Sequence, residues 1–162
     1  MTFQQWQIRH GVSDQAMYEL EQMLLEPSKT TGDVVGSSEA GSQQRIRAAA
    51  PHQCGILWRN NVGAFADERG VWVRYGICND SKKVNDKIKS SDLIGSTKIS
   101  YHGRHFGVFT AIECKKPGWK FTGSIRENAQ LKFHNIVRSN GGIAGFATSV
   151  NDYQQIIQEY IT

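Results

Sequence analysis

Short runs of β-branched and aromatic residues, bounded by Gly, Pro or charged residues, predict strands along the chain. The clearest run is 108–112, which is followed by charged residues and then by a Pro-Gly breaker. Runs at 55–58 and 71–75 predict two strands around a turn at 67–70, and 143–147 predicts a buried strand. The strands at 55–58 and 71–75 are expected to supply three core side chains, which are Trp58, Val71 and Val73.

Segments with an apolar residue at every third or fourth position predict helices. The clearest is 124–139, which a Gly-Gly pair ends. Ser38 is a suitable N-cap for a helix over 39–50, and Ser149 with Asp152 resembles a capping box that opens a last helix. The buried stripe expected on the helix 124–139 consists of Ala129, Phe133, Ile136 and Val137.

These elements predict an α/β domain over 38–162, of order α-β-β-β-β-α-β-α, with a central mixed sheet flanked by helices. Residues 27–37 are rich in Pro, Ser, Thr and Gly and are expected to form a linker. Residues 1–26 are expected to form a small helical appendage of two short helices joined near Gly11. The appendage is either a helix-turn-helix-like DNA contact or a packing or dimerisation element, and the lack of a basic stripe favours the second.

A chain of 162 residues with 39% hydrophobic content fits one globular domain with a modest core and a small appendage. Neither a membrane span nor a signal peptide is indicated, and we expect a cytoplasmic protein. Cys54, Cys78 and Cys114 are widely spaced, so we expect reduced and mostly buried thiols rather than disulfides or a zinc site. A net charge of +4 and a pI near 9.0 permit a polyanionic partner without requiring one.

Three charged residues stand where apolar runs begin or end. Glu113 and Lys115 follow the run 108–112 and project from the same face of the strand, because side chains alternate along a strand. A hairpin through 98–105 would return Glu113 beside Asp92. Two carboxylates and a lysine would then share one edge of a sheet.

This trio suits metal-assisted hydrolysis of a phosphodiester. Mg²⁺ binds carboxylate oxygens through few protein ligands and keeps several waters. It polarises a phosphoryl oxygen and lowers the pKa of a bound water. Lys115 would orient the attacking hydroxide or offset the charge that develops on the phosphate.

The order Asp92, Glu113-x-Lys115 resembles the PD-(D/E)xK nucleases. The segments 91–95 and 111–118 are similar to the virus-type replication-repair nuclease (VRR-NUC) branch of that superfamily. Ser91 stands in place of the proline of "PD", and Ser90 in place of the glycine before it. The resemblance covers residues 38–160 and extends to flanking positions, which are 57–63, Gln130, 141–145, Ser149 and Asp152.

The resemblance implies a restriction-endonuclease-like core and a site that holds Mg²⁺ or Mn²⁺. Asp92, Glu113 and the backbone carbonyl of Cys114 would bind the metal, and Gln130 would point back at the site. A family glutamate on the first helix matches Glu39, with Gln43 one turn on; Glu39 is otherwise an ordinary first-turn glutamate favoured by the helix dipole.

Several polar residues are candidates for contacts with DNA. Arg59 has a guanidinium suited to phosphate, and Asn60 follows it in the same predicted loop. Lys87 and Lys89 belong to a lysine run that is either a solvated face or a phosphate-gathering surface. Lys116 follows the catalytic candidate Lys115 and is assigned to DNA binding as well.

Four aromatic or imidazole side chains have competing interpretations. His102 and His105 are either a zinc pair or a general base, or else exposed turn residues, and the lack of nearby Cys or acidic partners favours exposure. Trp119 and Phe121 either stack on an unpaired base or cover the core edge, and we expect the second.

The resemblance to compact virus and phage members implies a homodimeric endonuclease acting on branched DNA such as four-way junctions. A monomeric nicking enzyme or a nuclease for RNA, single strands or flaps is the alternative. A non-catalytic DNA-binding module is a third possibility, against which the intact Asp92, Glu113 and Lys115 argue.

Overall fold

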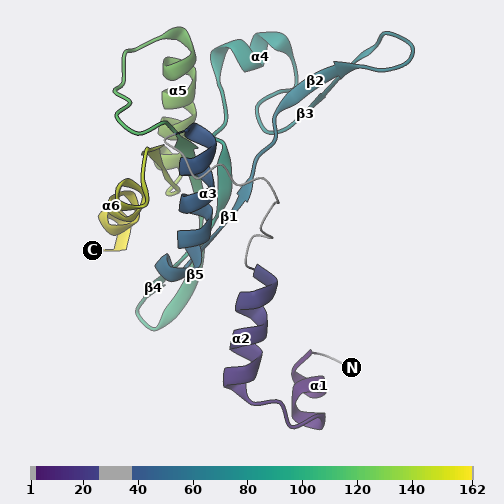
Figure 1. The fold of residues 1–162 in the computed structure, drawn as a ribbon, viewed down its shortest axis with the longest axis vertical. Helices are drawn as coiled ribbons and strands as arrows, with labels where there is room; N and C mark the ends of the chain where they lie inside the picture. The colour runs from purple at the N-terminus through teal and green to yellow at the C-terminus, as the bar shows by residue number, and fades with distance from the viewer. Residues whose placement is uncertain (1–2, 26–37, 162) are drawn as a thin grey trace. The chain divides into compact units, whose positions relative to one another are not determined.

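The structure is a computed structural model that describes residues 3–25 and 38–161. The chain divides into two compact units, residues 1–30 and 31–162, and each is described by itself (Figure 1). The predicted linker at 27–37 lies outside the described residues. Among the described residues, no helix is both long enough and apolar enough to cross a membrane.

The first unit contains two helices, α1 (Phe3–Arg9) and α2 (Asp14–Leu25), as predicted. Gly11 has a positive φ of 62°, which suits the turn between them. Ser13 caps α2, because its Oγ accepts a hydrogen bond from the backbone N of Ala16 at 3.1 Å.

The second unit is built on a four-stranded sheet of order β1-β4-β5-β6. The pairs β1–β4 and β4–β5 are antiparallel and β5–β6 is parallel, so the sheet is mixed, as predicted. The strands are β1 (Gly55–Arg59), β4 (Leu93–Tyr101), β5 (Arg104–Cys114) and β6 (Ile143–Ala147).

Helices cover both faces of this sheet and enclose two hydrophobic clusters. On one face, Ile46 of α3 and Tyr153 of α6 pack with Ile112 of β5. On the other face, Phe133 of α5 packs against Ala111 of β5. The helices are α3 (Glu39–Ala49), followed by the 3₁₀ turn η1 (Ala50–Gln53), α5 (Ile125–Ser139) and α6 (Val150–Ile161).

The helix starts at Ser38 and Ser149 follow the predicted capping residues, and Ser124 caps a third helix. Ser38 Oγ accepts from the backbone N of Gly41, and Ser124 forms a capping box with Glu127 at the start of α5. Ser149 Oγ accepts from the backbone N of Asp152 at 3.2 Å, at the start of α6.

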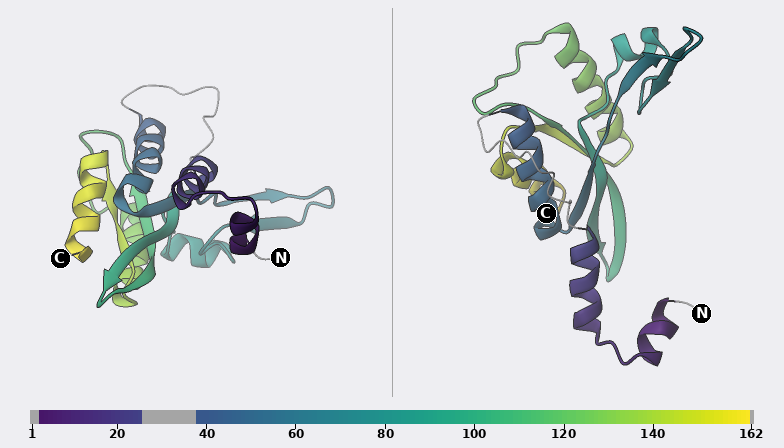
Figure 2. Two further views of the ribbon diagram at one scale, coloured as in Figure 1. Left: turned by 90° about the horizontal axis from the view of Figure 1, so that it is seen from below. Right: turned by 45° about the vertical axis from the view of Figure 1, so that its right-hand side comes forward.

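The predicted order lacked one strand and one helix, which are β2 (Gly63–Ala66) and α4 (Lys82–Lys87). Strands β2 and β3 (Trp72–Tyr75) form a separate two-stranded ribbon that projects from the four-stranded sheet (Figures 1 and 2), and α4 precedes β4. The predicted strand at 71–75 therefore pairs with β2 and lies outside the central sheet.

The predicted core positions of Trp58, Val71 and Val73 are wrong, because all three side chains are exposed. Leu57 occupies the covered face of the edge strand β1, which leaves Trp58 on the opposite face. Val71 and Val73 belong to the β2–β3 ribbon, on which no helix packs closely among the described elements.

Three further burial predictions need correction. Ile136 is exposed although Ala129, Phe133 and Val137 are buried as predicted, because the covered stripe of α5 is turned toward Gln130 and His134, which are buried. The three cysteines are free, as expected, but Cys54 is exposed, Cys78 is half-buried and only Cys114 is buried.

Candidate functional site

Asp92 and Glu113 meet at the open end of the β4–β5 hairpin. The pairing of Leu93 with Ile112 places the two carboxylates on adjacent strands. The backbone N of Cys114 donates to Asp92 Oδ2 at 3.0 Å, and the backbone N of Asp92 donates to Glu113 Oε2 at 3.2 Å. Each strand therefore fixes the carboxylate of the other, and the predicted juxtaposition is confirmed.

Lys115 and Gln130 both form hydrogen bonds with the carboxylate of Glu113. Lys115 Nζ donates to Glu113 Oε1 at 2.8 Å and to Gln130 Oε1 at 3.2 Å, and Gln130 Nε2 donates to the same Glu113 oxygen. All three side chains are buried. The ammonium also lies 5.8 Å from the ring centroid of Trp119 and 5.9 Å from that of Phe146, within the range of a cation–π contact.

Burial makes it costly for both carboxylates of the site to be ionised at once. Burial, and then the charge of Asp92, raise the pKa of Glu113 to about 7 although Lys115 opposes the shift. Burial raises the pKa of Asp92 as well, and the charge of Glu39 contributes to that increase. A cation placed between the two carboxylates would lower the cost of ionising both.

The donor set fits a hard divalent cation. Carboxylate oxygens from two neighbouring strands face the same pocket, and Mg²⁺ needs few protein ligands. The thiol of Cys114 packs in the core and burial raises its pKa, so only the main-chain carbonyl of that residue is a suitable ligand. In the described part of the chain, His, Cys, Asp and Glu side chains do not gather in threes as a metal-binding group.

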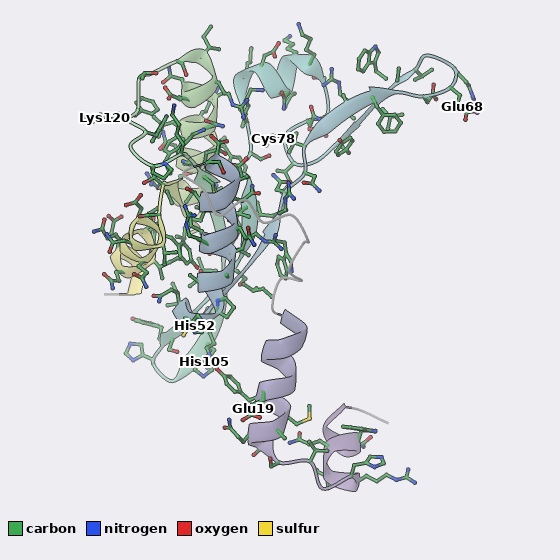
Figure 3. All side chains as sticks on the ribbon, viewed as in Figure 1. Glu19, His52, Glu68, Cys78, His105 and Lys120 are labelled. Carbon is green, nitrogen blue, oxygen red and sulfur yellow. The ribbon has the colours of Figure 1, made fainter. Side chains whose placement is uncertain are left out.

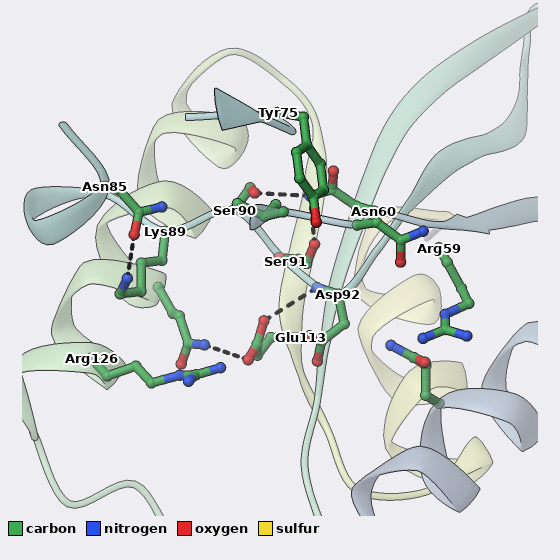
Figure 4. A pocket seen from close by; sticks show the side chains of 14 residues that line it. Arg59, Asn60, Tyr75, Asn85, Lys89, Ser90, Ser91, Asp92, Glu113 and Arg126 are labelled. Atoms are coloured by element: carbon green, nitrogen blue, oxygen red, sulfur yellow. Dashed lines mark hydrogen bonds between the residues drawn. The ribbon is translucent and has the colours of Figure 1, made fainter. Parts of the chain in front are cut away.

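A pocket of about 520 Å³ opens in front of the two carboxylates (Figure 4). Arg126 and Lys89 lie on one side of Asp92 and Glu113, and Arg59 lies on the other. The remaining lining residues are Gln43, Asn60, Asn61, Val62, Tyr75, Asn85, Ser90, Ser91 and Gln130. Cations and amides therefore surround an acidic floor, which suits a phosphate-bearing ligand.

The predicted DNA contacts divide into two groups. Arg59, Asn60 and Lys89 line the pocket, whereas Lys87 and Lys116 are exposed and lie outside its described lining. Asn60 has a structural task, because its Nδ2 donates to Ser90 Oγ at 2.8 Å and to the Ser91 carbonyl at 2.9 Å. It thereby fixes the loop that leads into β4.

Two predicted site residues do not face the pocket directly. Glu39 is exposed and Lys115 is buried behind Glu113, and neither belongs to the described lining. The pair His102 and His105 lies at the turn end of the β4–β5 hairpin, opposite the carboxylates, and both side chains are exposed as expected (Figure 3). His105 Nδ1 is 2.8 Å from Ser100 Oγ.

Trp119 joins the site from the loop after β5. Its Nε1 donates to Glu127 Oε1 at 2.9 Å, and its ring packs against Phe146 with centroids 5.0 Å apart. Phe121 packs against the same two rings but is exposed. The expected covering role is therefore fulfilled by Trp119 more than by Phe121.

Sequence reasoning missed two residues of α5 that belong to the site. Arg126 lines the pocket, and its charge lowers the pKa of both carboxylates. His134 is fully buried; its Nε2 is 2.9 Å from Ser91 Oγ, and burial lowers its pKa to about 3. Both lie four residues from Gln130, so helical spacing from that glutamine would have found them.

Comparison of the chain with models of protein families, with curated proteins and with solved structures finds no match.

Proposed function

We propose that this protein is a divalent-metal-dependent endonuclease that hydrolyses phosphodiester bonds in DNA, with a PD-(D/E)xK core of the VRR-NUC type. The observation that carries the proposal is the reciprocal hydrogen bonding of Asp92 and Glu113 at the floor of a pocket with a cationic rim. Sheet order and mixed pairing are compatible with such a core.

Asp92, Glu113 and the Cys114 carbonyl would hold Mg²⁺ or Mn²⁺, which supplies polarisation of the phosphoryl oxygen and a bound water of lowered pKa. Gln130 and Lys115 keep Glu113 Oε1 in place through the contacts described above. Lys115 would offset charge that develops on the attacked phosphate.

Binding of the DNA backbone falls to the cations at the pocket mouth. Arg59 and Arg126 stand on opposite sides of the carboxylates, so they would contact phosphates on the two sides of the scissile bond. Lys89 is held by Asn85, to whose Oδ1 its Nζ donates at 2.6 Å, and it adds a third positive charge.

We propose branched DNA, such as a four-way junction, as the substrate and a homodimer as the active form. A two-fold dimer presents two sites to symmetry-related strands and doubles the positive surface. The alternative is a monomer that nicks or cuts flaps and single strands, and the exposed aromatic residues of the β2–β3 ribbon favour an unpaired strand in the substrate.

The test is incubation of the purified protein with labelled junction, flap, linear duplex and single strand, in Mg²⁺ or Mn²⁺ against EDTA. Cleavage is expected only with metal, and Asp92→Asn or Glu113→Gln should lower its rate by about 100-fold or more. Glu159→Gln, an exposed change on α6, is the matched control and should cut normally. Cleavage in EDTA, wild-type rates in both site variants, or binding without cleavage in either metal would refute the proposal.

A further inference from the structure

The β2–β3 ribbon carries an apolar face that is about half exposed, and among the described elements neither of its strands packs closely on any strand or helix outside the ribbon. The register Gly63↔Tyr75 and Phe65↔Val73 places these four residues on one face. Phe65 is 53% and Tyr75 48% exposed. A two-stranded ribbon is marginally stable alone, so an uncovered apolar face of this kind indicates a binding surface.

This face begins inside the candidate active-site pocket. Tyr75 lines the pocket together with Asp92 and Glu113, and Figure 4 shows its ring pointing toward Ser91. Its ring lies 6.4 Å, between centroids, from that of Phe65. The two rings therefore form a row that leads from the carboxylates outward along the ribbon.

The backbone holds Tyr75 in this position. A Cβ at Gly63 would lie 2.3 Å from the Tyr75 hydroxyl, so the glycine allows the ring to lie across the ribbon. The buried Asn79 donates from Nδ2 to the carbonyls of Gly63 at 2.6 Å and of Tyr75 at 2.9 Å. One side of the ring is thus supported, and its remaining surface is exposed.

The row of rings begins at the cationic pocket and continues along the ribbon. Its ligand must therefore carry negative charge at the pocket end and present flat, apolar groups to the rings. Arg59, Lys89 and Arg126 would bind phosphate, and aromatic rings bind unpaired bases by stacking. A duplex cannot use these rings, because its bases are already stacked on one another. The cationic rim favours this anionic ligand over a second copy of the chain, whose net charge is +4.

We infer that the ribbon binds an unpaired nucleic-acid strand next to the bond that is cut, with one base on Tyr75 and the following base on Phe65. This inference rests on the proposed function and specifies its substrate: the strand leaves the duplex at the active site. Branched DNA with a single-stranded arm, such as a flap, meets this requirement and a fully paired four-way junction does not. The inference therefore favours the flap given above as the alternative substrate.

The experiment measures binding by the full-length protein in EDTA, so that cleavage is not needed. Fluorescence anisotropy gives the affinity for a labelled single-stranded DNA, a single-stranded RNA and a DNA duplex of the same length. Tyr75→Leu keeps an apolar side chain over Gly63 but removes the aromatic ring. Phe65→Leu likewise replaces the second ring of the row with an apolar side chain. Each should weaken single-strand binding by roughly 5- to 100-fold and leave duplex binding unchanged, whereas Tyr75→Phe should bind as the wild type.

Trp72→Leu is the matched control, because Trp72 is 67% exposed on the opposite face of the same ribbon and pairs with Ala66. Equal losses in Trp72→Leu, unchanged single-strand affinity in Tyr75→Leu and Phe65→Leu, or preferential binding of duplex would overturn the inference. So would a drop in mass by light scattering in Phe65→Leu, since the face would then join two copies of the chain. Comparison of the affinities for single-stranded DNA and single-stranded RNA shows which of the two the ribbon prefers.

Metal-dependent cleavage, measured on the same variants, separates the two proposals. Cleavage of a flap by the wild type without any dependence on Tyr75 would preserve the endonuclease and refute the strand-binding ribbon. Ring-dependent binding without cleavage in Mg²⁺ or Mn²⁺ would refute the endonuclease and retain a single-strand-binding surface.

Discussion

At Glu113, burial and the charge of Asp92 act in the same direction and raise the pKa from 4.5 to about 7. The folded state therefore binds this proton more tightly than the unfolded state does. The resulting stability is complete below about pH 4.5 and is lost as the pH rises through about 7. From the difference in pKa, the loss amounts to roughly 3 kcal/mol.

We predict that the free energy of unfolding of the metal-free protein falls by this amount from about pH 5 to about pH 8. Glu113→Gln should remove most of the slope, and Glu159→Gln should retain it. Urea unfolding at several pH values measures the effect. Added Mg²⁺ should restore stability to the wild type at the upper pH and not to Glu113→Gln. An unchanged slope in Glu113→Gln would show that the titration belongs elsewhere.

Lys115 allows a second prediction at this scale. Lys115→Met keeps an apolar stem against Trp119 and Phe146 but removes the ammonium that contacts Glu113. Turnover should fall by about 100-fold or more, whereas DNA affinity should stay unchanged because Lys115 lies behind the pocket lining. Metal affinity should increase, since a cation beside the carboxylates is lost.

Anisotropy in EDTA and single-turnover cleavage separate these effects. Lys116→Met, the adjacent but exposed change, is the comparison and should lower affinity more than turnover. Affinity that falls in step with turnover in Lys115→Met would make Lys115 a phosphate contact and not part of the chemical step.

The sequence was sufficient to place Asp92, Glu113, Lys115 and Gln130 together, because strand alternation and one hairpin fix three of them and a family resemblance adds the fourth. Tyr75 could not be placed, because its position depends on a ribbon whose main chain is held by hydrogen bonds from the Asn79 side chain. Such side-chain contacts to the main chain leave no periodic signal in the sequence.

At the scale of elements, α5 carries much of the site, since Arg126, Gln130 and His134 lie four residues apart on it. Its first turn is fixed by a reciprocal cap: Ser124 Oγ accepts from the backbone N of Glu127 at 3.3 Å, and Glu127 Oε2 accepts from the backbone N of Ser124 at 3.0 Å. Loss of the cap would loosen the turn that positions Arg126.

We predict that Ser124→Ala lowers the free energy of unfolding by about 1 kcal/mol and weakens DNA binding. Ser139→Ala, at the other end of the same helix, is the control, because its Oγ contacts only the nearby Ile136 carbonyl among the contacts described. Chemical denaturation and anisotropy measure the two effects. Equal stability of Ser124→Ala and the wild type would mean that tertiary packing alone holds the helix.

The helices α3, α5 and α6 were predicted almost to the residue, whereas β2 and α4 were missed. The segment Gly63–Ala66 contains one large apolar residue, and Lys82–Lys87 is dominated by charge, so neither has the pattern of its element. Exposed Trp58 shows the complementary error: aromatic composition indicates a strand but not which face is covered.

For the whole molecule, we predict a dimer in solution that prefers a four-way junction to linear duplex. The whole chain has a net charge of only +4, so one copy has little positive surface with which to hold two arms. The preference should weaken as salt rises, because it depends on phosphate contacts spread over several arms.

Light scattering with and without junction DNA, combined with cleavage at several salt concentrations, tests this prediction. A monomer's mass in both states, together with equal cutting of junction and duplex, would favour the monomeric alternative. The sequence could not assign a dimer interface, since the interface depends on which exposed faces match and not on local pattern.

The β4–β5 hairpin has a consequence for the order of events in folding. It is the longest ladder in the sheet and joins residues that are near in sequence, so we expect it to form early. We expect the ladder to be formed in the folding transition state up to its open end, where Asp92 and Glu113 lie, so that their repulsion would already act there. Glu113→Gln should accordingly speed refolding in stopped-flow measurements at about pH 8, more than it slows unfolding. A divalent cation bound between these carboxylates during synthesis would offset their repulsion and so help the nascent chain to fold, before any substrate is bound.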